Sequence, residues 1–86
     1  MNIVGTWNYK LDSPFGQMDI TYYFRVDGTY TYFNAVTGQR TDGEYEISGN
    51  RMNFPNLGKT INFTLSGDNL SLDYGSSSGP QNLKRV

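Results

Sequence analysis

The chain has 86 residues and a net charge of −1, and its seven basic residues are spread along the sequence. A single domain over 1–86 is expected, because two hydrophobic cores do not fit in so short a chain. A nucleic-acid surface and electrostatic docking to anionic membranes both need a concentrated basic patch, so neither is expected. Cysteine and histidine are absent, which excludes catalysis by these residues and the common zinc sites.

Neither a membrane-spanning helix nor a signal peptide is expected from the sequence. No apolar run approaches the roughly 20 residues that a membrane-spanning helix needs. The first residues lack the basic, apolar and small-residue regions that form a signal peptide. The expected location is therefore the cytoplasm, or the outside of the cell as a mature domain without its leader.

The composition and the hydrophobic pattern both indicate β-structure. Seven Tyr and five Phe favour strands, and ten Gly fit frequent tight turns. Apolar and polar residues alternate with a period of two in successive segments, and no segment has a convincing helical period. The predicted strands cover residues 3–11, 18–26, 29–33, 43–48, 52–54, 61–66, 70–74 and 82–86.

Short turn sequences separate these strands. Asp27-Gly28 is the strongest hairpin signal, and Gly49-Asn50 and 67–69 are further tight turns. Short connections make each strand pair with its neighbour in sequence, which gives a meander. The prediction is an all-β, antiparallel up-and-down barrel of about eight strands, because closing the sheet removes its exposed edges. An interior of this size is filled by side chains or holds one small ligand.

Several short motifs resemble those of a known superfamily. Gly5-Thr6-Trp7 on the first strand of an eight-stranded meander resembles the lipocalin and wider calycin pattern. Phe-x-x-Asp-Gly-x-Tyr at 24–30, Gly-x-Tyr-x-Ile at 43–47 and Ser-Gly-Asp-x-Leu-x-Leu at 66–72 are similar to the short bacterial lipocalin-like domains. The chain is shorter than a full lipocalin and lacks its disulfides and C-terminal helix. The resemblance therefore implies a miniature barrel.

The same resemblance implies how one end of the barrel is closed. In that superfamily the tryptophan of the first strand closes the barrel, and a basic residue of the last strand packs across its ring. Arg85 occupies the corresponding place here, so a cation–π pair with Trp7 is expected. Gly5, Trp7 and Arg85 are the expected closure residues.

The inner face of the predicted barrel is rich in tyrosine. A purely structural core favours Leu, Val and Phe, because each buried phenol needs a hydrogen-bond partner. Phenols around a cavity would combine apolar walls with polar tips, as ligand pockets do. The first hypothesis is therefore a non-enzymatic module that binds a small hydrophobic or aromatic ligand inside the barrel. The candidate ligand-binding residues are Tyr22, Phe24, Tyr30, Tyr32, Tyr45, Phe63 and Tyr74. The alternative is that some hydroxyls simply reach water at the barrel mouth.

The second hypothesis is a filled barrel that acts as a protein-interaction or inhibitor domain. Tyr23 and Phe33 are expected on the outer face of adjacent strands, where they either stabilise the hairpin or contact a protein partner. The loops at 12–16, 36–40 and 75–80 would add contacts. A monomer or weak oligomer is expected.

No catalytic residue, metal site or cofactor is expected. Glu44 and Glu46 are near neighbours, but the alternation places both on the solvent face, so they are not expected to act as a catalytic pair. Gly75–Gly79 resembles a phosphate-binding loop only in composition, because no lysine and no helix follow it. The free volume inside the barrel decides between the two hypotheses.

Overall fold

The structure is a computed structural model that describes residues 2–14, 16–75 and 79–86. This part of the chain contains strands and turns and no helix. The strands are β1 (Gly5–Ser13), β2 (Gly16–Phe24), β3 (Thr29–Asn34), β4 (Arg40–Glu44), β5 (Glu46–Ser48), β6 (Arg51–Phe54), β7 (Lys59–Ser66), β8 (Asn69–Asp73) and β9 (Gln81–Arg85).

The nine strands found in the described ranges belong to one antiparallel sheet, in the order β4-β3-β2-β1-β9-β8-β7-β6-β5. The first and last strands are neighbours, with Trp7 opposite Arg85 and Asn8 opposite Lys84. The two edge strands, β4 and β5, follow each other in the chain and are joined by Tyr45. The sheet is thus a nearly closed meander barrel, which confirms the predicted fold class.

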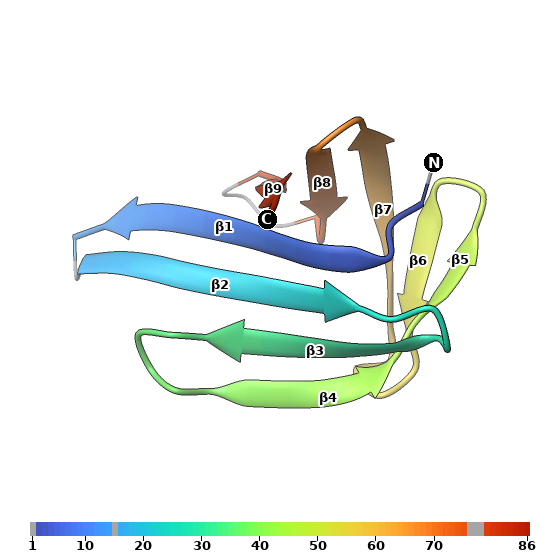
Figure 1. Cartoon of the computed structure of the whole chain (residues 1–86), viewed down its shortest axis with the longest axis horizontal. Helices are drawn as coiled ribbons and strands as arrows, with labels where there is room; N and C mark the ends of the chain where they lie inside the picture. Colours follow the sequence, from blue (N-terminus) through green and yellow to red (C-terminus); the bar gives the residue numbers. More distant parts are fainter. Residues whose placement is uncertain (1, 15, 76–78) are drawn as a thin grey trace.

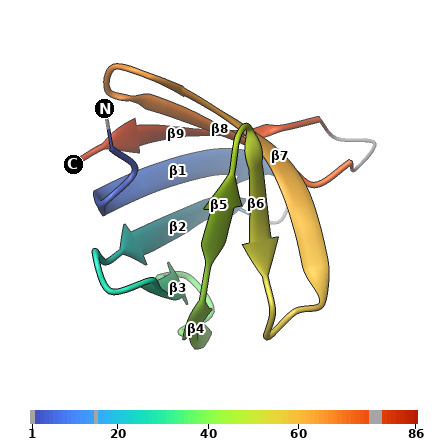
Figure 2. The ribbon, with the colours of Figure 1, turned by 90° about the vertical axis from the view of Figure 1, so that its right-hand side faces the viewer.

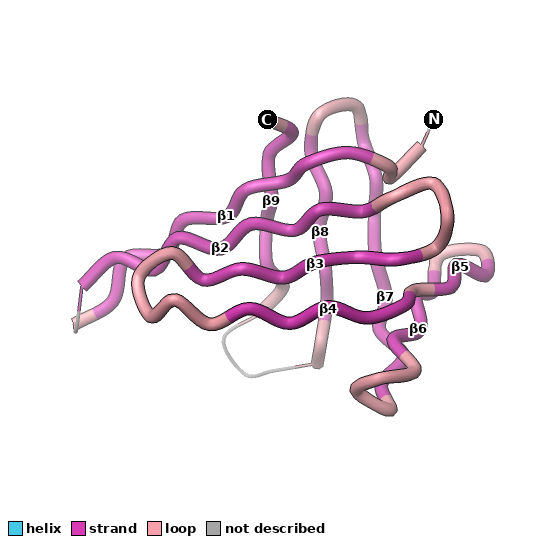
Figure 3. Tube along the Cα trace, turned by 60° about the horizontal axis from the view of Figure 1, so that its bottom comes forward, coloured by secondary structure: helices cyan, strands magenta, loops and turns pink. Residues whose placement is uncertain are grey.

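The barrel is flattened into two walls. Strands β1 to β4 form one wall, and β7 to β9 cross behind it at a steep angle (Figure 1 and Figure 3). Viewed from the side, β5 and β6 lie between the two walls (Figure 2). The inner faces of both walls therefore point toward one shared core.

The predicted strand at 43–48 is the main point of difference. It begins earlier, at Arg40, and is divided at Tyr45 into β4 and β5, which raises the strand count from about eight to nine. The Tyr45 amide donates to the Gly28 carbonyl at 2.9 Å, beyond the last register pair of β3 and β4. Ile47 shares the alternation of Tyr45 but is 45% exposed. The chain bends here to pass from one wall to the other.

The core fills the centre of the barrel. Side chains from both walls meet there and are almost completely buried: Trp7, Phe24, Tyr30, Met52, Phe54, Leu70, Leu72 and Leu83. Among the described residues, no buried side-chain nitrogen or oxygen lacks a hydrogen-bond partner. The Trp7 indole nitrogen, for example, donates to the Ile3 carbonyl at 2.8 Å.

The expected stack of Arg85 on Trp7 is present, with the Trp7 ring itself buried in the core. The guanidinium carbon lies 4.3 Å from the centroid of the indole ring. The guanidinium also donates to the carbonyls of Val4 (3.1 Å) and Asn2 (3.0 Å). Gly5 has φ +137°, and a Cβ at this position would lie 2.9 Å from Arg85 Nη1. The absence of a side chain at Gly5 therefore admits the arginine.

Candidate functional site

A pocket of about 230 Å³ opens to solvent at the edge of the filled core. Its wall is a cross-strand row, in which Tyr22 of β2 is opposite Tyr32 of β3 and Tyr32 is opposite Thr41 of β4. Strand alternation directs these side chains to the inner face. Among the described residues, the lining is formed by Tyr22, Tyr30, Tyr32, Gln39, Thr41, Leu57 and Tyr74.

Two hydroxyl groups of the pocket are joined in a chain of hydrogen bonds. The hydroxyls of Tyr22 and Tyr74 are 3.0 Å apart, and the Tyr22 hydroxyl donates to Gln81 Oε1 at 3.3 Å. This chain links β2, the end of β8 and β9, which are far apart in sequence. Burial raises the pKa of Tyr22 far above its ordinary value, and burial also raises the pKa of Tyr74. Both phenols are therefore neutral at physiological pH.

A third phenol is held by an asparagine in the turn after β6. The Tyr30 hydroxyl donates to Asn56 Oδ1 at 3.3 Å and accepts from Asn56 Nδ2 at 3.1 Å. Its ring packs edge-on against Phe54, with the centroids 4.9 Å apart. Tyr30 thus anchors the side of the pocket to the core.

None of the described residues that line the pocket is charged. Its polar groups are phenol and threonine hydroxyls and the Gln39 amide, and its apolar surface comes from aromatic rings and Leu57. Such a surface suits a neutral ligand, because a buried charge is costly without a partner of opposite charge.

The pocket includes four of the seven residues expected to bind a ligand, namely Tyr22, Tyr30, Tyr32 and Tyr74. The other three lie elsewhere. Phe24 is buried in the core, stacked on Tyr22 with centroids 5.6 Å apart. Tyr45 packs edge-on against Phe24 and donates its hydroxyl proton to the Arg25 carbonyl at 2.7 Å. Phe63 is half-buried against the core.

Three lining residues were not expected from the sequence. Gln39 and Leu57 belong to turns, whose side-chain directions a two-residue period does not specify. Thr41 precedes the predicted start of its strand, in the polar segment Arg40-Thr41-Asp42. Of these three residues, only Thr41 could have been predicted to face inward. If the two-residue alternation is extended from Gly43 toward the N-terminus, it places Thr41 on the inner face.

The outer face of β2 to β4 carries the predicted aromatic pair. Tyr23 is 39% exposed and Phe33 is half-buried. Tyr23 is opposite Thr31, whereas Phe33 is opposite Thr21, so the two aromatic residues are diagonal neighbours. Of the predicted contact loops, residue 15 and residues 76–78 lie outside the described residues.

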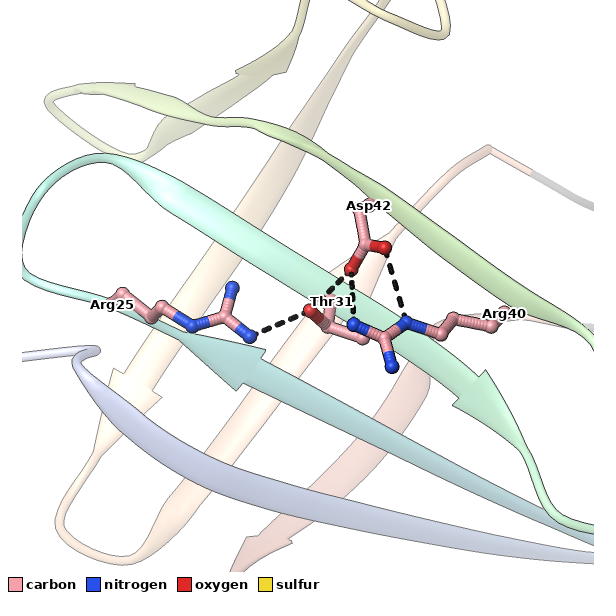
Figure 4. A network of polar contacts seen from close by, with 4 residues as sticks. All are labelled: Arg25, Thr31, Arg40 and Asp42. Carbon is pink, nitrogen blue, oxygen red and sulfur yellow. Dashed lines mark hydrogen bonds and ion pairs between the residues drawn. The ribbon is translucent and has the colours of Figure 1, made fainter.

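A polar network crosses this same outer face (Figure 4). Thr31 is only 4% exposed, because charged side chains cover it from both sides. Its hydroxyl accepts from Arg25 Nη2 at 2.7 Å and donates to Asp42 Oδ1 at 2.6 Å. Arg40 Nε lies 3.0 Å from Asp42 Oδ2. The network joins the turn after β2 to β3 and β4.

A second hollow, of about 300 Å³, lies along β7, β8 and β9. It is lined largely by small polar side chains and by Lys84, which donates to Asn69 Oδ1. In the described ranges, no group of three or more His, Cys, Asp or Glu residues is placed to hold a metal ion. The same ranges contain no helix long and apolar enough to cross a membrane.

The fold and the pocket define a small antiparallel barrel with a tyrosine-lined opening at one side of its core. No family model matches the sequence, and searches of the curated proteins and of the solved structures return no match. The lipocalin-like resemblance therefore stays a prediction that rests on sequence motifs.

Proposed function

We propose that the protein is a non-enzymatic, lipocalin-like module that binds a small, neutral, aromatic molecule in the tyrosine-lined pocket. The observation that carries this proposal is the pocket of about 230 Å³ to which four tyrosine side chains contribute. Typical ligand pockets measure about 300–1,000 Å³. The pocket therefore suits a ligand smaller than most drug-sized molecules.

The size of the pocket sets the size of the ligand. A cavity of about 150 Å³ accommodates benzene, so a volume of about 230 Å³ suits one substituted aromatic ring. Aromatic walls favour such a ring, because edge-to-face contacts add to the gain from burying apolar area. Tyr22 and Tyr32 already adopt this geometry with each other, with centroids 5.5 Å apart.

The ligand would occupy the side of the core instead of its centre. Trp7, Phe24 and Tyr30 fill the middle of the barrel, whereas the pocket is bounded by Leu57 and Gln39, which are both exposed. A ligand can therefore enter from solvent without unfolding a strand.

Leu57 and Ile47 offer a matched test of this proposal. Both are exposed aliphatic residues, 46% and 45% accessible, but only Leu57 lines the pocket. Leu57→Thr should weaken the binding of toluene or indole about 5- to 10-fold, because about 1–1.4 kcal/mol of apolar contact is lost. Ile47→Thr should leave the affinity unchanged. Ligand-observed NMR with purified protein measures both.

Two results would contradict the proposal. One is the absence of binding for all single-ring probes at millimolar concentration. The other is an equal loss in both variants, which would place the probe on a general apolar surface.

A filled core also supports a second function, that of a protein-interaction domain. Its candidate contact is Tyr23 with the diagonal Phe33 on the outer face of β2 and β3. Tyrosine and arginine are enriched at binding hot spots, and Arg25 adjoins this surface. A partner captured by the wild type and lost with folded Phe33→Ser would support this function. Unchanged capture would exclude this patch.

A further inference from the structure

The direction of the hydrogen bonds beside the pocket determines what its ligand must offer. A phenol carries one proton, and the Tyr22 hydroxyl donates its proton to Gln81 Oε1 at 3.3 Å. Either oxygen could donate in the 3.0 Å contact between Tyr22 and Tyr74; because the contact with Gln81 uses the Tyr22 proton, we assign the proton of this contact to Tyr74. Tyr74 Oη has thus given away its only proton and retains acceptor lone pairs.

The position of Tyr74 is set by packing. Its ring is stacked on Phe54, with the planes 6° apart and the centroids separated by 6.4 Å. Its hydroxyl is held by Tyr22, which is 3% exposed. Both rings line the pocket. A ligand therefore meets a pre-positioned acceptor there, with little ordering cost on binding.

The other phenol beside the core is already satisfied. Tyr30 both donates to and accepts from the Asn56 amide, so it competes little for a polar group of the ligand. The hydroxyls of Tyr32 and Thr41 and the Gln39 amide lie along β3, the β3–β4 connection and β4. These groups offer polar contacts to that side of the ligand.

A carboxylate is poorly suited to this pocket. In the part of the lining that the structure describes, no residue supplies a positive charge, and a carboxylate oxygen beside Tyr74 Oη would place two acceptors together. Burial of an unpaired carboxylate carries a large desolvation cost.

Resting on the binding function proposed above, we infer that the ligand is a neutral single-ring compound with a hydrogen-bond donor. A phenol O–H or a pyrrole-type N–H of this ligand donates to Tyr74 Oη, while its ring packs against Tyr22 and Tyr32. The pocket thereby distinguishes phenol-like and indole-like molecules from hydrocarbons and acids of the same size.

Three probes of similar shape test the inference: 4-methylphenol, 4-fluorotoluene and 4-methylbenzoate. Their affinities are measured by ligand-observed NMR at constant pH and salt. 4-Methylphenol should bind at least about 5-fold more tightly than 4-fluorotoluene, which keeps the ring and lacks the donor. 4-Methylbenzoate should show no measurable binding.

Tyr74→Phe removes the acceptor and keeps the ring. In this variant 4-methylphenol should lose its advantage, while the affinity of 4-fluorotoluene stays within about 2-fold of wild type. Tyr9→Phe is the matched control, since Tyr9 is half-buried against the core and does not line the pocket. It should preserve the preference for 4-methylphenol.

The outcomes separate the two proposals. Equal affinity of 4-methylphenol and 4-fluorotoluene for the wild type would overturn the donor inference and leave the binding function standing. No binding of any probe would overturn both. The wild-type comparison decides the inference even if Tyr74→Phe fails to fold.

Discussion

Arg85 holds together three parts of the chain that are far apart in sequence. Its guanidinium stacks on Trp7, donates to the carbonyls of Asn2 and Val4, and lies 3.3 Å from Asp68 Oδ1. A planar, five-donor group is required to make these contacts at once. Lysine has a compact ammonium and does not reproduce this geometry.

We therefore expect Arg85→Lys to lower the free energy of unfolding by about 1–3 kcal/mol, because charge-assisted hydrogen bonds and part of the ring contact are lost. Urea unfolding measures this change. The control is Arg51, which is exposed. Arg51→Lys should change the free energy of unfolding by no more than about 0.5 kcal/mol. Equal stability of the two variants would contradict the role given to Arg85.

At the residue scale, the pairing of Trp7 with Arg85 was expected from the resemblance of Gly5-Thr6-Trp7 to the lipocalin pattern. The sequence was also informative about the inward direction of Tyr22, Tyr30 and Tyr32, since a strand has a two-residue period. The hydrogen-bond partners of the tyrosine hydroxyls could not be predicted from the strand period. Gln81 is far from Tyr22 in sequence, and only the packed barrel brings them together.

At the scale of elements, the outer-face network joins three parts of the β2–β4 wall. The Thr31 hydroxyl, and then the Arg40 guanidinium, hold the pKa of Asp42 below its ordinary value. A lowered pKa in the folded state means that folding favours the ionised carboxylate. Its stabilising contribution is present above the ordinary pKa, and it is lost as the pH falls through the lowered value of the folded state.

Asp42→Asn should therefore lose less stability than the wild type when the pH falls below about 4. The difference in unfolding midpoint between variant and wild type is measured from pH 7 to pH 2, and it should shrink as the pH falls. Thr31→Val, which removes the hydroxyl, should reproduce part of this effect. Parallel acid profiles for wild type and Asp42→Asn would show that the network does not couple to folding. Asp27 retains a lowered pKa through Thr29, so some acid dependence persists in both variants.

The elements themselves were largely predictable, with one informative exception. Alternation continues without interruption through Gly43, Tyr45 and Ile47, so the local pattern contains no sign of the division at Tyr45. The early start of β4 was also hidden, because Arg40-Thr41-Asp42 is polar on both faces. These residues form a strand because β3 offers them a hydrogen-bond ladder, with Phe33 opposite Arg40.

For the whole molecule, the chain closes the barrel in two different ways. At the termini, β1 and β9 are joined by strand pairing, and the Val86 amide donates to the Thr6 carbonyl at 2.9 Å. On the opposite side, β4 and β5 are the two ends of the sheet order, and the connection between them is the backbone of Tyr45. The two ends of the chain also lie on the same side of the barrel (Figure 2).

Circular permutation distinguishes these two closures. In both permutants a short Gly/Ser linker joins the original termini. Opening the chain between Gly49 and Asn50 should lower the free energy of unfolding by no more than about 1–2 kcal/mol, because the cut falls in an exposed turn. Opening it between Tyr45 and Glu46 should lower the free energy of unfolding further, because this cut removes the link between the edge strands β4 and β5. Chemical unfolding of both proteins provides the comparison. Equal stability would show that the packed core alone closes this side.

The sequence by itself determined the class of fold, the order of the strands and the face to which most core residues point. These features follow from local rules of strand period and turn chemistry. The expectation that Arg85 stacks on Trp7 beside Gly5 comes instead from the resemblance of the motifs to the lipocalin pattern. Only the tertiary structure decided that the centre of the barrel is filled, and that the remaining space lies beside Tyr22 and Tyr74. The reason is physical: an unfilled volume is the remainder left when side chains from distant strands and turns pack together. The pocket depends on the final positions of Gln39 and Leu57, which no local pattern contains.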